Sequence, residues 1–243
     1  MYKITRLLSL ATVTAALAAP AAGAQSLATY GGLELSGLGE GNGVLGVSIT
    51  SGMLGWHPAI NANVQRYTFR TGTGTASRNA FVPSLGMQYR AHDGSFGGSV
   101  GYAFVGGGDN AVPVIGVGGT GGGTSGVVLG LQGNYWGNQQ EHQAILSYNT
   151  KSEYYWTRFR AAHQINPHTR DVPVYLGAEL VYQGGPVKNL TPQVNVHRLQ
   201  AGPTINFHFT PNFHLGFQGG VTTRDPSATS GYARVEFLSL TSF

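Results

Sequence analysis

The chain of 243 residues lacks cysteine and has few charged residues. Without cysteine it forms neither a disulfide framework nor a thiolate zinc site. Charged residues make up 10% of the chain, whereas ordinary soluble domains contain about 25%. Beyond the N-terminus, no apolar run reaches the roughly 20 residues that a membrane-spanning helix needs. The composition therefore excludes helical membrane spans and fits strands that alternate an apolar with a polar face.

The only long apolar run lies at the N-terminus. Lys3 and Arg6 precede LLSLATVTAALAA, and Pro20 and AAGA follow it, which is the pattern of a cleaved signal peptide. The alternative, a membrane anchor, is disfavoured because the run is shorter than roughly 20 residues. We expect cleavage after Ala24, so that residues 1–24 are the signal peptide and residues 25–243 form one domain. Losing the two cations lowers the formal net charge from +4 to +2 (4 minus 2), so the basic character is no evidence for a nucleic-acid partner.

The segment YNTKSEYYWTRFRAAHQI, residues 148–165, shows the alternation most clearly. One parity carries Tyr155, Phe159, Ala161 and Ile165, and the other carries Tyr154, Trp156, Arg158, Arg160 and Gln164. A strand places these two sets on opposite faces, whereas a helix would spread them around its circumference. A turn at Lys151-Ser152 would pair Tyr148 with Tyr155. By the same test, a turn around Pro211 would pair His208 with His214 and Phe209 with Phe213.

The second face of every predicted strand is polar or small and never a packed set of large apolar residues. A soluble sandwich needs an apolar inner face, so the pattern predicts an all-β, antiparallel transmembrane barrel in the outer membrane. The predicted strands are 28–37, 43–53, 58–70, 80–90, 95–105, 125–136, 141–150, 153–165, 172–183, 194–209, 213–222 and 231–242. We expect about 12 strands, with 10 to 14 possible, because residues 111–119 are a further candidate strand.

Alternate predicted connections fall at opposite ends of such a barrel. One set, which includes 71–79, 106–124, 184–193 and 223–230, is mostly long, and the other is short. Outer-membrane barrels have short periplasmic turns and longer external loops, so both termini are expected on the periplasmic side. The chain ends at Phe243, and a terminal aromatic residue resembles the signal that the bacterial barrel-assembly machinery recognises.

Several charged and aromatic side chains are expected to face the barrel lumen. The predicted lumen network contains Glu34, Arg90, Arg158, Arg160, Glu179 and Arg198, with Arg234 and Glu236 as further candidates. The predicted lumen aromatics are Trp136, Tyr154, Trp156 and Tyr175. Buried charges must be paired or solvated, so the charged set either fills a narrow lumen with salt bridges or lines a pore that contacts a polar solute. The aromatics would either stack on sugar rings or plug the barrel.

The remaining candidate sites are weaker. His208 and His214 would be inward neighbours on paired strands, but two imidazoles make half a metal site and no carboxylate is predicted beside them. GVGGTGGGTSG lacks the Gly-Lys-Ser/Thr of a phosphate loop and is expected to be an external loop. His142 lies where outer-membrane lipid hydrolases place a catalytic histidine, but Ala144 stands where the serine is needed. We therefore predict no metal, no cofactor and no enzyme activity.

Residues 125–222 resemble the cellulose biosynthesis protein BcsS family. The matching segments are Ser147-Tyr148-Asn149-Thr150, Tyr155-Trp156-Thr157-Arg158-Phe159-Arg160, Gly177-Ala178-Glu179 and Arg198-Leu199-Gln200-Ala201-Gly202. The last departs from the family pattern, because Ala201-Gly202-Pro203 stands where Gly-x-Phe is expected. The resemblance implies an outer-membrane accessory to exopolysaccharide production. Its partners would be outer-membrane lipid, the barrel-assembly machinery and polysaccharide or polysaccharide-export components.

Three classes of function remain open from the sequence. The first is a barrel for passage or docking of exopolysaccharide or another polar solute. The second is a structural or adhesion barrel with a filled lumen. The third is an outer-membrane enzyme that modifies lipid.

Overall fold

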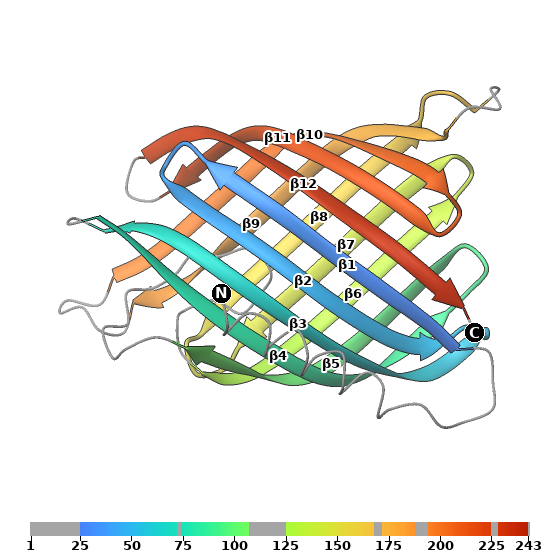
Figure 1. The fold of residues 1–243 in the computed structure, drawn as a ribbon, viewed down its shortest axis with the longest axis horizontal. Helices are drawn as coiled ribbons and strands as arrows, with labels where there is room; N and C mark the ends of the chain where they lie inside the picture. Colours follow the sequence, from blue (N-terminus) through green and yellow to red (C-terminus); the bar gives the residue numbers. More distant parts are fainter. Residues whose placement is uncertain are drawn as a thin grey trace, which may run out of the picture.

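The computed structural model describes residues 25–71, 74–106, 125–167, 172–187, 194–224 and 228–242. They form a closed barrel of twelve antiparallel strands, in which each strand pairs with its sequence neighbours and β1 pairs with β12 (Figure 1). The strands are β1 (Gln25–Ser36), β2 (Glu40–Ser51), β3 (Gly55–Thr71), β4 (Gly74–Arg90), β5 (Gly94–Gly106), β6 (Gly126–Gly137), β7 (Gln140–Asn149), β8 (Tyr154–Gln164), β9 (Val174–Val187), β10 (Val194–Thr210), β11 (Phe213–Arg224) and β12 (Ala228–Ser242). The predicted fold class and strand number are confirmed. The predicted signal peptide, the candidate strand 111–119 and Phe243 lie outside the described residues.

The strand registers follow the predicted alternation. Tyr148 pairs with Tyr155 across the β7–β8 turn, and His208 pairs with His214 across the β10–β11 turn. The predicted backbone pairing of Phe209 with Phe213 is wrong, because the register shifts between His208 and Thr210 and places Thr210 opposite Phe213. Such a bulge leaves one residue of the longer strand without a direct partner. The two phenylalanine rings nevertheless lie side by side as predicted, with their centroids 6.1 Å apart.

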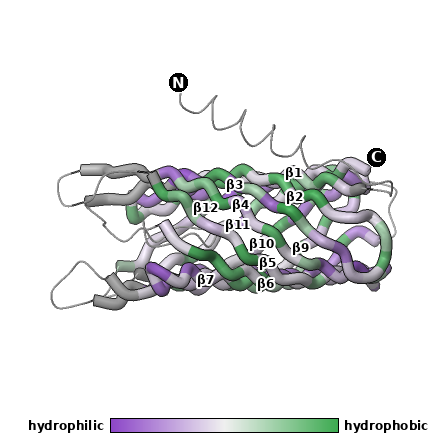
Figure 2. The backbone as a smooth tube through the Cα atoms, turned by 90° about the horizontal axis from the view of Figure 1, so that it is seen from below, coloured by the Kyte–Doolittle hydropathy of each residue, from purple (hydrophilic) through white to green (hydrophobic). Residues whose placement is uncertain are grey.

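The outer face of the barrel is apolar and exposed. Leu85, Leu131 and Phe159 expose 66%, 60% and 54% of their surface, and Figure 2 shows hydrophobic residues interleaved with hydrophilic ones along the strands. A band of this kind suits lipid contact rather than water. Among the described residues, no helix is long and apolar enough to cross a membrane.

Aromatic side chains gather on the outer face near both ends of this band. Trp56 contacts Phe96 edge to face at a centroid distance of 5.1 Å. Near the opposite end, Tyr155 lies 5.5 Å from Tyr182, and its hydroxyl lies 2.8 Å from Nδ1 of His197. Amphipathic rings of this kind form the girdles at the two membrane interfaces of outer-membrane barrels.

The two ends of the barrel differ less in loop length than expected. We call the end with residues 107–125 the loop end, and the end with the Asn138-Gln139 and Pro211-Asn212 turns the turn end. Predicted loop 71–79 is wrong for most of its length, because β3 continues to Thr71 and β4 begins at Gly74. At the turn end, β8 and β9 are separated by residues 165–173. The difference between the ends therefore rests mainly on the connection between β5 and β6.

Candidate functional site

The inner face of the barrel carries a connected set of eight charged side chains. This lumen network consists of Glu34, Glu40, Arg158, Arg160, Glu179, Arg198, Arg234 and Glu236. They come from β1, β2, β8, β9, β10 and β12. Four arginines balance four glutamates, so the network is formally neutral.

Glu179 and Glu236 organise one half of the lumen network. The Glu179 carboxylate lies 2.7 Å from Nε of Arg158 and 3.2 Å from Nη2 of Arg160. Glu236 Oε2 accepts a hydrogen bond of 2.6 Å from each of the same two arginines. Because β8 and β12 lie four positions apart in the strand order, these contacts reach across the lumen rather than along the wall.

Glu34 organises the other half. Its two oxygens accept hydrogen bonds from Arg198 Nη2 at 2.9 Å and from Arg234 Nη2 at 2.6 Å. Gln200 Nε2 donates to Glu34 at 3.0 Å. Arg234 also contacts Glu179 at 2.5 Å, so it joins the two halves into one network.

The lumen network is mostly shielded from water. Glu34, Glu179, Arg198 and Arg234 expose between 2% and 4% of their surface. Removing one partner from a buried ion pair leaves an uncompensated charge and costs about 3–5 kcal/mol. Arg160 and Glu236 are half-buried, so they form the part of the network that borders the remaining lumen space.

The structure gathers most of the predicted lumen residues and separates one of them. Glu34, Arg158, Arg160, Glu179 and Arg198 belong to the network, and so do the candidates Arg234 and Glu236. Arg198 pairs with Glu34 and Glu40 rather than with its near neighbour Glu179. Arg90, at the end of β4, makes no ion pair with any described residue.

Sequence reasoning missed Glu40. It fell within the predicted loop 38–42, but the structure starts β2 at this residue. Its carboxylate lies 3.4 Å from Nη1 of Arg198. An acidic residue immediately before the GNGVLGV segment was the only available indication.

The predicted lumen aromatics have different surroundings. Tyr154 and Trp156 are 4% exposed and pack with Val181 and Ile145, so they fill space and are not available to stack on a solute. The Tyr175 ring lies 4.5 Å from the His208 ring. Trp136 is 42% exposed and lies opposite Glu141 near the turn end.

The lumen wall formed by β3 to β7 differs from the network side. Six of its inward side chains carry amides or hydroxyls and remain partly accessible: Asn61, Ser84, Gln88, Ser99, Asn134 and Gln143. The same wall also carries Glu141 and a buried apolar cluster of Val82, Ala103 and Val128. Gln132, which lies opposite Gly97 on β5, is exposed. Asn134 accepts a hydrogen bond of 3.0 Å from Gln143. One side of the lumen is therefore closed by paired charges, and the other presents uncharged polar groups to water.

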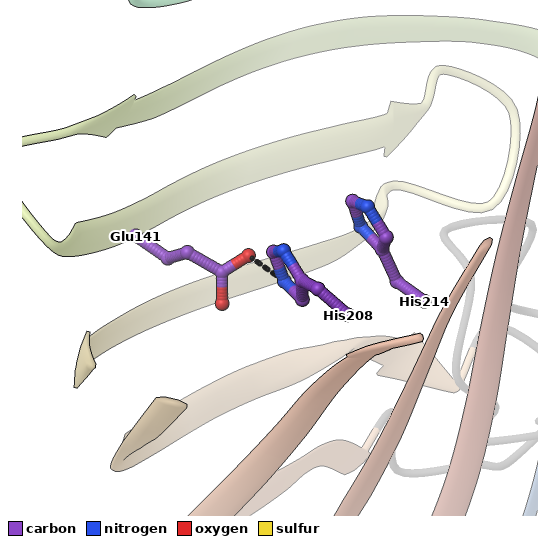
Figure 3. Close-up of side chains that lie close together, drawn as sticks. All are labelled: Glu141, His208 and His214. Atoms are coloured by element: carbon purple, nitrogen blue, oxygen red, sulfur yellow. Dashed lines mark ion pairs between the residues drawn. The ribbon is translucent and has the colours of Figure 1, made fainter. Parts of the chain in front are cut away.

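A carboxylate lies beside the inward histidine pair, contrary to prediction. Oε1 of Glu141 is 2.8 Å from Nε2 of His208, and the His208 and His214 rings are stacked at 3.7 Å (Figure 3). Glu141 lies on β7, three positions from β10 in the strand order, so the pairing of adjacent strands did not reveal it. The expectation that no carboxylate accompanies the histidines is wrong.

His142 faces the outside of the barrel. Its ring stacks on Tyr135 at 5.7 Å, and its Nε2 lies 3.0 Å from Oε1 of Gln140. Within the described part of the chain, no serine or threonine hydroxyl is bonded to it.

No family model matches the chain, and no curated protein matches it. Solved bacterial barrels are similar in fold. An outer membrane channel from Pseudomonas putida F1 is 11% identical, with a TM-score of 0.53 over 92% of this chain and 97% of that chain. The β-domain of the Bordetella autotransporter BrkA is 12% identical, with a TM-score of 0.51 over 90% and 99% of the two chains. The KdgM porin, solved in complex with disordered oligogalacturonate, is 11% identical, with a TM-score of 0.48 over 87% and 98%.

At these identities, the likeness to the Pseudomonas channel and to the BrkA β-domain shows the fold. The closed barrel and its apolar outer face agree with it. The protein is an outer-membrane β-barrel with a porin-like or channel-like fold.

Proposed function

We propose that the barrel admits an uncharged polar solute of the carbohydrate class through the accessible side of its lumen. The observation that carries this proposal is the wall of amides and hydroxyls on β3 to β7, with Gln132 exposed beside it. Such groups donate and accept hydrogen bonds, as sugar hydroxyls require. The lumen network opposite is formally neutral, so it adds no strong preference for ions of one sign.

We propose exopolysaccharide, or its building blocks, as the solute. The support is the resemblance of residues 125–222 to the BcsS family. Within the Tyr155–Arg160 segment that carries it, Arg158 and Arg160 belong to the lumen network and Phe159 faces outward. The segment that resembles the family therefore contributes ion pairs to the lumen network, and the solute would contact the opposite wall, on β3 to β7.

Passage is tested by adjacent substitutions on opposite faces of β6. Gln132→Phe places a bulky ring in the accessible part of the lumen, whereas Leu131→Phe places the same ring in the lipid-facing band. In planar bilayers we expect channel conductance from the wild type and from Leu131→Phe, and a clear loss with Gln132→Phe. Liposome swelling in uncharged sugars should follow the same order.

A structural barrel with a filled lumen is the second candidate, and the burial of the lumen network favours it. It predicts neither conductance nor sugar uptake from the wild-type barrel. That result would contradict passage. The exopolysaccharide proposal is tested separately, by measuring extracellular polysaccharide in a strain that lacks the gene and is complemented with the wild type or with Gln132→Phe.

A further inference from the structure

We propose that Glu141, His208 and His214 bind one divalent transition-metal ion of the zinc class inside the turn end of the lumen. None of these three residues belongs to the lumen network, and none is among the accessible amide and hydroxyl residues of β3 to β7. The proposal does not depend on solute passage, because an ion can bind here whether or not the barrel conducts.

The donor set has the chemistry of such a site. Two imidazole nitrogens and one carboxylate oxygen are common protein ligands of Zn²⁺, and Cu²⁺ and Ni²⁺ also favour imidazole. One ligand atom from each residue lies within 4.8 Å of the others. Two atoms bound to a tetrahedral ion at about 2.05 Å lie about 3.4 Å apart. Small rotations of the side chains would therefore close the site without movement of the strands.

The backbone brings the two histidines together. They face each other across the β10–β11 hairpin, whose turn, Pro211-Asn212, is short. The rings are nearly parallel, with an interplanar angle of 5°. Tyr175 packs close to the His208 ring, which limits where the ring can turn.

Glu141 reaches the histidines over two small inward residues. The Asn138-Gln139 turn has positive φ at both positions, 49° and 65°, as a type I′ hairpin turn requires, and Glu141 follows it on β7. Ala162 faces Glu141 on β8, and Gly177 faces Ala162 on β9. Because neither residue carries a long side chain, the carboxylate can extend toward β10.

Asn206 holds the carboxylate in place. Its Nδ2 donates to Oε2 of Glu141 at 2.9 Å, which leaves Oε1 directed at His208. Metal-ligating carboxylates are usually oriented by a hydrogen bond of this kind. Among the described residues, Nε2 of His208 is shielded from solvent and makes no hydrogen bond of acceptable angle, although Oε1 is close to it.

Three protein ligands leave one position of a tetrahedral ion for water or for a solute oxygen. A bound ion would also connect β7 to β10 and β11 across β8 and β9. Together with the Glu141 carboxylate, the ion would give the site a net charge of +1. The site therefore combines a link across the inner wall with an open coordination position that faces the lumen.

Binding is measured on the full barrel in detergent, without a polyhistidine tag and after treatment with a chelator. Calorimetric titration with Zn²⁺ should give one saturable site per chain. Co²⁺ should produce the visible absorption bands of a four- or five-coordinate ion. Neither readout needs a variant, so the proposal remains testable if a substitution impairs folding.

Variants then identify the ligands. Removing a residue that binds the ion should lower the metal affinity at least as much as removing a residue that only hydrogen-bonds to a ligand. Glu141→Gln and His214→Ala should therefore lower the affinity by about 100-fold or more. Asn206→Ala should lower it by about 10–100-fold. The matched control is His142→Ala, which removes an outward-facing histidine next to Glu141 and should leave the affinity unchanged.

Two results would overturn the proposal. The first is the absence of a one-to-one site in the wild type, which would mean that Glu141 and His208 form only an ion pair. The second is equal loss of binding in His142→Ala and His214→Ala, which would assign the metal to surface histidines. His214 makes no ion pair with any described residue, so His214→Ala is expected to retain the barrel fold.

Discussion

Individual residues of the lumen network share partners and therefore do not act alone. Glu179 contacts Arg158, Arg160 and Arg234, and Glu236 contacts the same three arginines. Such a network is energetically non-additive, because the loss of one member changes the partners of several others. Stability measurements on single and paired substitutions are therefore the appropriate test.

Glu179→Gln should destabilise the barrel by about 3–5 kcal/mol if the network is dry, because three arginines lose a buried countercharge. Adding Arg160→Gln should restore part of this loss, since it removes the excess positive charge and Arg160 is only half-buried. The measurement is urea unfolding in phospholipid vesicles, with Asp93→Asn in an exposed turn as the control. A cost below about 1 kcal/mol would show that water reaches Glu179.

The site residues differ in how far the sequence could place them. Strand parity was enough to put Arg160 and Glu179 on one face of adjacent strands, where the structure pairs them. Parity could not predict the contact of Arg158 with Glu236 or of Glu141 with His208, because each joins strands that are not neighbours. Such contacts depend on the barrel's cross-section and on small residues between the partners, which no local pattern encodes.

At the scale of strands, the alternation predicted almost every element to within a few residues. It works because each strand contacts lipid on one side and the lumen on the other, so side chains of opposite character alternate strictly. The errors lie at the loop end, where β3 and β4 extend through a predicted loop, and at the His208–Thr210 bulge. The composition of residues 71–79 is typical of a turn, so the sequence did not reveal that β3 and β4 continue there. A bulge changes which residues lie opposite each other on paired strands, and it leaves the composition unchanged.

Cysteine labelling tests the facing of the strands. Leu146, Phe159, Leu176 and Phe217 are exposed on the outer face. Cysteines there should react with lipid-soluble maleimides and not with polar ones when the barrel is in a membrane. A cysteine at Gln132 should react with a polar maleimide, whereas one at Gln218, which is 5% exposed, should not. Polar labelling of the outer set would show that the strand parity is wrong.

Two glycines provide a matched test of the close approach between strands. A Cβ atom at Gly177 would lie 2.0 Å from the carbonyl oxygen of Ala161, whereas at Gly133 it would meet nothing within 4 Å. Gly177→Ala should therefore cost about 1–3 kcal/mol through overpacking, and Gly133→Ala should change stability little. Urea unfolding of both variants measures the difference. Equal stability would show that β8 and β9 separate easily at Ala161.

At the scale of the whole molecule, the barrel presents opposite polarity to its two surroundings. All twelve strands have paired neighbours, so no sheet edge is left open, as a lipid environment demands. The termini of the barrel meet at the turn end, where Ser26 pairs with Ser242 (Figure 1). The proposed metal site lies at this end, whereas Glu34 and Glu40 of the lumen network flank the β1–β2 turn at the loop end.

The location of the protein follows from this polarity. The protein should fractionate with outer membranes, because its exposed apolar band would otherwise contact water. Closed hydrogen bonding should also keep the barrel folded in dodecyl sulfate at room temperature, so boiled and unboiled samples should migrate differently on gels.

Deleting Phe243 should reduce the heat-modifiable fraction if the assembly machinery recognises the terminal aromatic, whereas replacing it with Tyr should not. Recovery of the wild type as a soluble periplasmic protein would contradict the membrane assignment, and normal assembly without Phe243 would remove only its predicted role.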